Sequence, residues 1–112
     1  MLTMPDDLTM LAFFESEPVE QKLSDGFACY KYADDQVELY FSYNIFERSI
    51  QTRILVSGKQ VSLHCQEGCE NVSVVKGHSV EYLKCNFQVA SRVSIAEIRL
   101  RPDIDIRWST LT

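Results

Sequence analysis

Cys65 and Cys69, with His64 beside them and Cys85 further along the chain, are the residues whose types could bind a metal ion. Structural zinc sites usually need two pairs of closely spaced ligands, and this sequence offers only one pair. Neighbouring residues of a β-strand point to opposite faces, so His64 and Cys65 would not hold one ion together. We expect no metal site and interpret Cys65 and Cys85 as small core residues.

A cysteine nucleophile is the second chemistry that these residue types suggest. The thiol needs a base within hydrogen-bond reach, which strand geometry denies to Cys65 and His64. Cys69 could meet His78 across a turn, but no third group is evident to orient the imidazole. The four glycines each fit a turn, so the sequence contains no phosphate-binding glycine loop. We expect a protein that is not an enzyme and that needs no cofactor.

The elements that position these residues are predicted to be mainly β-strands. From Phe27 onwards, apolar and polar residues alternate, as they do in half-buried strands. About seven or eight such runs follow one another at roughly ten-residue spacing, and the short turns between them favour antiparallel neighbours. The pattern predicts a β domain over about residues 27–111, built as an antiparallel β-sandwich or a curled half-barrel. The residues expected to face inward in the run after Gly58 are Val61, Leu63 and Cys65.

One short helix is predicted at the N-terminus, over about residues 4–16. Thr3 or Met4 can cap it, and Asp6 with Asp7 places negative charge at the positive end of the helix dipole. Pro18 ends it, because the residue before a proline resists helical geometry. The residues predicted to face the core are Met4, Leu8, Leu11 and Ala12, with Phe14 at the edge of this face. We expect helix and strands to form a single domain over residues 1–112.

Composition and charge exclude several classes of protein. The chain is 46% apolar and 24% charged, which is ordinary for a folded globular protein, and its net charge is −5 from 16 acidic and 11 basic residues. An acidic excess repels nucleic-acid phosphates and favours basic partners. No segment has the pattern of a signal peptide or a membrane span. We therefore expect a cytoplasmic protein with four reduced thiols that binds neither nucleic acid nor membrane.

Acidic residues that project from turns, with no obvious basic neighbour, are the predicted partner-binding residues. Turn positions are available for recognition, whereas inward strand positions are committed to the core. Tyr40 lies on the polar phase of its strand and is the predicted aromatic anchor of the contact. The acidic members of this predicted site are Asp34, Asp35, Glu38, Glu67, Glu70 and Asp103.

The last two strands carry the densest charge. Glu97, Arg99 and Arg101 are predicted to share one face, and Asp105 with Arg107 the matching face of the next strand. We interpret these residues as cross-strand ion pairs, each worth a few tenths of a kcal/mol, and not as a binding site.

Three segments carry a family resemblance: residues 37–53 (VELYFSYNIFERSIQTR), 66–68 (QEG) and 106–111 (IRWSTL). Together they resemble small bacterial immunity proteins, which are encoded beside polymorphic toxins and contact-dependent growth inhibition toxins. The resemblance covers roughly residues 27–111. It implies a non-enzymatic inhibitor that binds a cognate toxin domain, often a nuclease. An acidic surface would suit that role, because nuclease active sites are basic.

Other functions remain open at this point. The aromatic residues could line a ligand or carbohydrate cleft, and the chain could be a structural subunit of a larger assembly. An active site built from scattered residues would give no local motif. The sequence leaves the oligomeric state open. A toxin reading frame beside the gene would separate the immunity interpretation from these alternatives.

Overall fold

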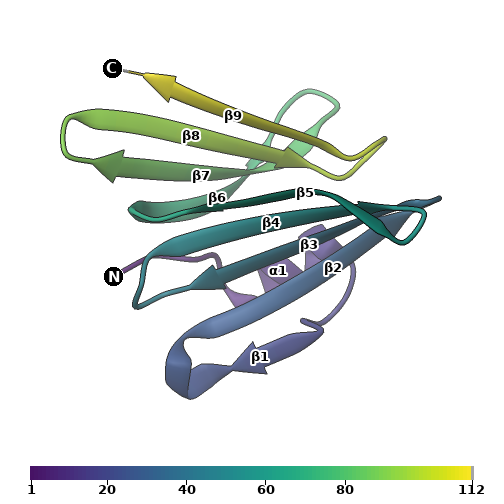
Figure 1. Ribbon diagram of the computed structural model, residues 1–112, viewed down its shortest axis with the longest axis horizontal. Helices are drawn as coiled ribbons and strands as arrows, with labels where there is room; N and C mark the ends of the chain where they lie inside the picture. The colour runs from purple at the N-terminus through teal and green to yellow at the C-terminus, as the bar shows by residue number, and fades with distance from the viewer. Residues whose placement is uncertain (112) are drawn as a thin grey trace.

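The computed structural model describes residues 1–111 and shows two antiparallel sheets with one α-helix (Figure 1). Thr112, the last residue of the predicted domain, lies outside the described residues. One sheet has the order β1-β2-β3-β4-β5 and the other β6-β7-β8-β9. This confirms the predicted mainly β fold with one N-terminal helix. The elements are α1 (Asp7–Phe14), β1 (Glu20–Lys22), the 3-10 helix η1 (Leu23–Asp25), β2 (Phe27–Asp34), β3 (Val37–Asn44), β4 (Ser49–Val56), β5 (Lys59–Gln66), β6 (Cys69–Lys76), β7 (Glu81–Val89), β8 (Arg92–Arg99) and β9 (Asp105–Leu111).

The turns explain why consecutive strands pair. Ser57 and Gly58 have φ values of 50° and 81° and form a two-residue hairpin between β4 and β5, where positive φ matches the twist of the strands. In the longer β3–β4 turn, the Asn44 side-chain oxygen accepts hydrogen bonds from the backbone N–H groups of Phe46 at 3.0 Å and Glu47 at 2.9 Å. Because these hydrogen bonds join residues close in the sequence, the Asn44 side chain stabilises the turn locally.

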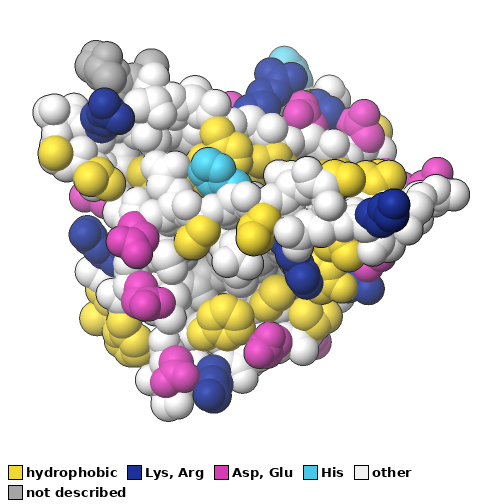
Figure 2. All heavy atoms as spheres, in the orientation of Figure 1, with side chains coloured by type: hydrophobic (Ala, Val, Ile, Leu, Met, Phe, Trp, Pro, Cys, Tyr) yellow, Lys and Arg dark blue, Asp and Glu magenta, His cyan; other side chains and the backbone are white. Residues whose placement is uncertain are grey.

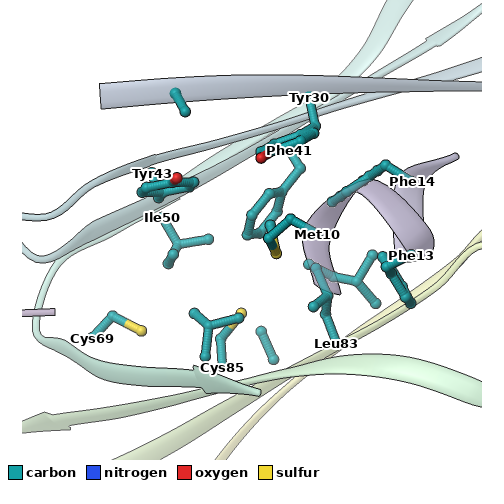
Figure 3. Packing of buried hydrophobic residues seen from close by; sticks show 14 of the residues in the cluster. Met10, Phe13, Phe14, Tyr30, Phe41, Tyr43, Ile50, Cys69, Leu83 and Cys85 are labelled. Carbon is teal, nitrogen blue, oxygen red and sulfur yellow. The ribbon is translucent and has the colours of Figure 1, made fainter. Parts of the chain in front are cut away.

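The core lies between the two sheets, and α1 closes it on one side. Figure 3 shows Phe14 of the helix pointing toward Tyr30 and Phe41 of the five-stranded sheet, with Leu83 of β7 below. The Phe14 ring stacks on Tyr30 at 4.9 Å and on Phe41 at 5.7 Å between centroids. Full burial of each such side chain contributes about 1.5–3 kcal/mol, so the helix is held mainly by these contacts.

The predicted core-facing side of the helix is wrong for Leu8 and Ala12, which are exposed, whereas Met4 packs against the core as predicted. Met10, Phe13 and Phe14 are buried, whereas Leu8 is 76% exposed. Both sets of residues recur at helical spacing, and two phenylalanine rings bury more apolar area than Leu8 and Ala12 would. The helix therefore turns its aromatic side to the sheets.

The helix is also shorter than predicted. The Asp6 carboxylate accepts a hydrogen bond from the Thr9 backbone N–H at 2.7 Å, so Asp6 caps the helix and Met4 lies before it. Hydrogen bonds from Thr9 hold the pKa of Asp6 below its usual value. At the other end Glu15 adopts a left-handed φ of 61° and its N–H bonds the Leu11 carbonyl, which ends the helix at Phe14.

Alternation placed the inward residues of most strands correctly but failed for β5. The register pairs Leu63 with Arg53 and Cys65 with Gln51 on the outer face of the five-stranded sheet. His64 pairs with Thr52 on the inner face. Leu63 and Cys65 are exposed, and so is Val61. The predicted inward positions of Val61, Leu63 and Cys65 are therefore wrong, because alternation separates two faces without telling which one meets the core.

Arg101 also differs from its prediction, since it does not share a face with Glu97 and Arg99. Its Nη2 donates a hydrogen bond to the Phe13 carbonyl at 2.9 Å. Its Nη1 lies 3.2 Å from a Glu15 carboxylate oxygen, within ion-pair distance but not aligned for a hydrogen bond. Arg101 thus ties the C-terminal end of α1 to the segment between β8 and β9, where a positive charge also complements the helix dipole.

We expect Arg101→Met to lower the free energy of unfolding by about 1–2 kcal/mol, because it leaves the Phe13 carbonyl without its charged donor. Urea denaturation followed by circular dichroism measures this loss. Arg107→Met is the matched control, since the Arg107 side chain is 72% exposed and pairs at the surface with Asp105. That variant should change stability by less than about 0.5 kcal/mol. Equal losses in the two variants would contradict the assigned role of Arg101.

Candidate interaction surface

The cysteine, histidine and carboxylate side chains that could bind a metal ion or act as nucleophiles do not cluster in the described part of the chain. Within residues 1–111, no three His, Cys, Asp or Glu side chains gather closely enough to hold a metal ion. All four cysteines are free: Cys69 and Cys85 are buried, Cys29 is half-buried and Cys65 is exposed. In the same described part of the chain, no helix has the length and apolar character needed to cross a membrane.

Two hollows on the surface are small. One, of about 180 Å³, lies on the outer face of the four-stranded sheet beside Tyr82, Arg99 and Asp105. The other, of about 270 Å³, lies between α1 and β6 beside Leu8 and Lys76. Ligand pockets usually measure roughly 300–1,000 Å³, so neither hollow favours a ligand-binding module.

The charges beside the first hollow pair with one another. Asp105 lies 3.5 Å from Arg99 on the neighbouring strand and 3.2 Å from Arg107 on its own. This confirms the predicted cross-strand ion pair for Arg99 and Asp105 only, because Arg107 pairs within its own strand and no ion pair among the described residues involves Glu97. Arg99 also contacts the predicted partner-binding residue Asp103, at 2.7 Å between Nη2 and the carboxylate. The premise that Asp103 lacks a basic neighbour is therefore wrong, because the turn folds it back onto β8.

Asp34, Asp35 and Glu38 lie at the β2–β3 hairpin, on the right of Figure 1. Asp34 is half-buried at the end of β2, and Asp35 is exposed with a left-handed φ of 54° that aspartate tolerates. The Glu38 carboxylate is 3.1 Å from the Lys31 ammonium, so the premise of no basic neighbour is wrong for Glu38 as well. Glu38 lies opposite Ala33 in the hairpin, so Lys31 is its diagonal neighbour on the same face. The sequence does not reveal this contact, because it depends on the register of the two strands.

Tyr40 lies on the outer face of the five-stranded sheet, half-buried between two cations. The Arg53 guanidinium carbon is 4.4 Å from the Tyr40 ring centroid, and the Lys31 ammonium is 5.6 Å from it. These cation–π contacts hold the ring against the sheet. An aromatic side chain held in this way presents less free surface to a partner than the sequence suggested.

Glu67 and Glu70 lie at the opposite end of the molecule, on the left of Figure 1. Both are exposed, and no described side chain forms an ion pair with either of them. Figure 2 shows hydrophobic and acidic side chains together at this end. We call this surface the acidic end and define it by Leu23, Phe46, Glu47, Glu67 and Glu70.

Backbone hydrogen bonds bring the three segments of the acidic end together. The Cys69 N–H bonds the Arg48 carbonyl at 2.9 Å, which joins the β5–β6 connection to the β3–β4 turn. The Ile45 N–H bonds the Gly26 carbonyl at 2.9 Å, which joins the β3–β4 turn to the segment that contains Leu23, and the Phe46 ring lies against Gly26, where a Cβ would meet it at 3.0 Å. The left-handed φ of 67° and this close approach favour glycine at position 26.

Leu23, Phe46 and Glu47 were not among the predicted site residues. Phe46 is 61% exposed and Leu23 is 79% exposed, so two large apolar side chains lie free beside unpaired carboxylates. The sequence offered one sign of this exposure: Phe46 lies in the middle of a turn, where no strand alternation directs its side chain toward the core. Protein interfaces combine an apolar centre of this kind with a polar rim.

Comparison with known proteins gives one informative result. No protein-family model matches the sequence, and no curated protein matches it significantly. The structure is similar to a chain of the contact-dependent growth inhibition toxin–immunity protein complex from Klebsiella pneumoniae 342, with a TM-score of 0.92 and 24% sequence identity. The match covers 97% of this chain and 96% of the other. At this identity the likeness shows the fold, and it confirms at the level of the fold the resemblance found in the sequence.

Proposed function

We propose that this protein is an immunity protein that binds a cognate contact-dependent growth inhibition toxin domain and neutralises it without catalysis. The observation that carries the proposal is the fold, which is shared over nearly the whole chain with a chain of a toxin–immunity protein complex. Of the two partners in such a complex, a chain of net charge −5 suits the one that covers a basic active site. We infer that the toxin domain is basic, as a nuclease would be, and that the protein acts in the cytoplasm.

We assign the main contact to the acidic end. Phe46 and Leu23 supply exposed apolar area for the centre of an interface, and Glu47, Glu67 and Glu70 supply a negatively charged rim. The group formed by Asp34, Asp35, Glu38 and Tyr40, with Asp103, is the second candidate surface. Two of its carboxylates already have basic partners, so it offers less free negative charge. Strands of eight residues, about 25 Å long, separate the two groups, so their contributions can be measured independently.

We expect Glu67→Lys combined with Glu70→Lys to slow association with the toxin domain by at least about tenfold at low salt, because it reverses the charge that attracts a basic partner. The toxin is the domain encoded beside this gene, and surface plasmon resonance over a salt series measures the rate. Asp34→Lys combined with Asp35→Lys makes the same change in net charge at the other end and is the matched control. Circular dichroism checks that both variants fold.

Four outcomes are informative. A larger loss in the Glu67 and Glu70 variant supports the acidic end, and a larger loss in the Asp34 and Asp35 variant moves the contact to the hairpin. Full protection of toxin-expressing cells by both variants would place the contact on another face. If the unmodified protein neither binds nor protects against the neighbouring toxin, the proposed function is wrong.

A further inference from the structure

The first three residues, which we call the strap, cross the acidic end and join the parts that the two sheets contribute to it. The Leu2 N–H bonds the Ile45 carbonyl at 3.1 Å, in the β3–β4 turn directly before Phe46. The Thr3 N–H bonds the Glu70 carbonyl of β6, also at 3.1 Å. Figure 1 shows the N-terminus at the end of the molecule that carries this turn. The strap therefore links a turn of the five-stranded sheet to an edge strand of the four-stranded sheet.

Glu70 occupies an irregular position of β6. Its neighbours Cys69 and Asn71 lie opposite consecutive residues of β7, so Glu70 is an extra residue that faces no partner there. A β-bulge of this kind bends the strand and re-aims a side chain, and its extra residue takes no part in the ladder. The bond from Thr3 therefore holds the backbone at the point from which the exposed Glu70 side chain projects.

Both inner residues of the strap are fixed. The Leu2 side chain is 3% exposed and belongs to the core. Thr3 forms a parallel bridge with Asn71, and its carbonyl accepts a hydrogen bond from the Val72 N–H at 2.9 Å. Thr3 itself is exposed, so its contribution lies in its backbone groups and not in its side chain.

We propose that Leu2 and Thr3 are positioning residues of the toxin contact: the strap holds Phe46 and Glu70 at the spacing in which both meet the partner. This inference rests on the proposed function. Phe46 comes from one sheet and Glu70 from the other, so a partner that contacts both needs them in one fixed arrangement. Side chains that are in place before binding cost less to order, and the gain appears mainly as slower dissociation.

Thr3→Pro tests the strap, because proline lacks the N–H that bonds Glu70. We expect the toxin domain encoded beside this gene to dissociate about tenfold faster, because Glu70 must then be ordered on binding. The bond between Cys69 and Arg48 remains, so the acidic end should loosen without coming apart. Association should change by less than about twofold, since no charge changes. Surface plasmon resonance measures both rates.

Thr3→Ala is the matched control, because it keeps the N–H and removes only an exposed side chain, so it should bind like the parent. Arg101→Met separates positioning from general stability. It weakens the fold where Arg101 bonds the Phe13 carbonyl, away from the acidic end, and should leave toxin dissociation unchanged. If Thr3→Pro dissociates like Thr3→Ala, or if Arg101→Met dissociates as fast as Thr3→Pro, the proposal is wrong.

Amide hydrogen exchange tests the strap without a toxin. In Thr3→Pro, the amides of Val72 and Ile45, one in each sheet, should exchange at least about tenfold faster than in Thr3→Ala. If Thr3→Pro does not fold, Leu2→Ala takes its place, because it loosens the strap through its buried side chain. Equal exchange in variant and control would overturn the proposal. A parent that binds no toxin, combined with the expected exchange, would refute the proposed function and leave the strap as the element that orders the acidic end.

Discussion

Replacing Phe14 with alanine is expected to lower the free energy of unfolding by about 3–5 kcal/mol, the cost of removing a fully buried phenylalanine. The Phe14 side chain is 1% exposed and lies where the helix meets the five-stranded sheet. Its ring stacks on Tyr30 and Phe41 and packs edge-on against Phe13 at 5.1 Å. A cavity there removes contacts from the helix and from two strands at once. Urea denaturation followed by tyrosine and tryptophan fluorescence measures the loss.

Leu8→Ala is the matched control for this prediction. It removes an apolar side chain from the same short helix, but Leu8 is 76% exposed, so its loss should cost less than about 0.5 kcal/mol. The comparison separates core packing from any general weakening of the helix. Similar losses in the two variants would mean that Leu8 packs in the core as fully as Phe14 does, and would contradict this orientation of the helix.

This helix shows where periodicity is ambiguous. A period of 3.6 fits the set Met10, Phe13 and Phe14 as well as the set that includes Leu8 and Ala12. The choice depends on which set fills the space between two sheets, which is a property of the tertiary structure. Strand alternation predicted the inward face of β3 and β7 correctly, because clearly polar residues occupy the alternate positions of these strands. It failed for β5, whose edge position leaves both of its faces exposed.

The candidate site was predictable only in part. The sequence located the acidic turns, and the structure shows Glu67 and Glu70 exposed as expected. It did not reveal the partners of Glu38 and Asp103, because a diagonal pair depends on strand register and a turn contact depends on the path of the chain. Phe46 was missed because strand alternation makes no prediction for a residue in a turn, and its place beside Gly26 depends on the path of the chain. The functional proposal came from family resemblance and not from residue chemistry.

Alkaline pH is expected to destabilise the protein strongly. Burial raises the pKa of the Cys69 thiol to about 12 and that of Cys85 further still, whereas an unfolded cysteine titrates at about 8.5. Above that pH the unfolded chain releases protons that the folded protein retains, so stability is complete below about pH 8.5 and falls as pH rises toward 12. Burial also raises the pKa of Tyr30 to about 12, which adds a loss of the same sign above about pH 10.

Each buried thiol should add about 1.4 kcal/mol per pH unit to the slope of this loss between pH 9 and 11. Cys85→Ala should therefore flatten the slope by about that amount, whatever fixed cost its small cavity adds at neutral pH. Cys65→Ala removes an exposed thiol and should leave the slope unchanged. Urea denaturation at half-unit steps of pH, with reductant present throughout, gives the three slopes. A parent slope near zero, or an equal change in both variants, would show that Cys85 is ionised in the folded protein and that its burial does not set the alkaline limit.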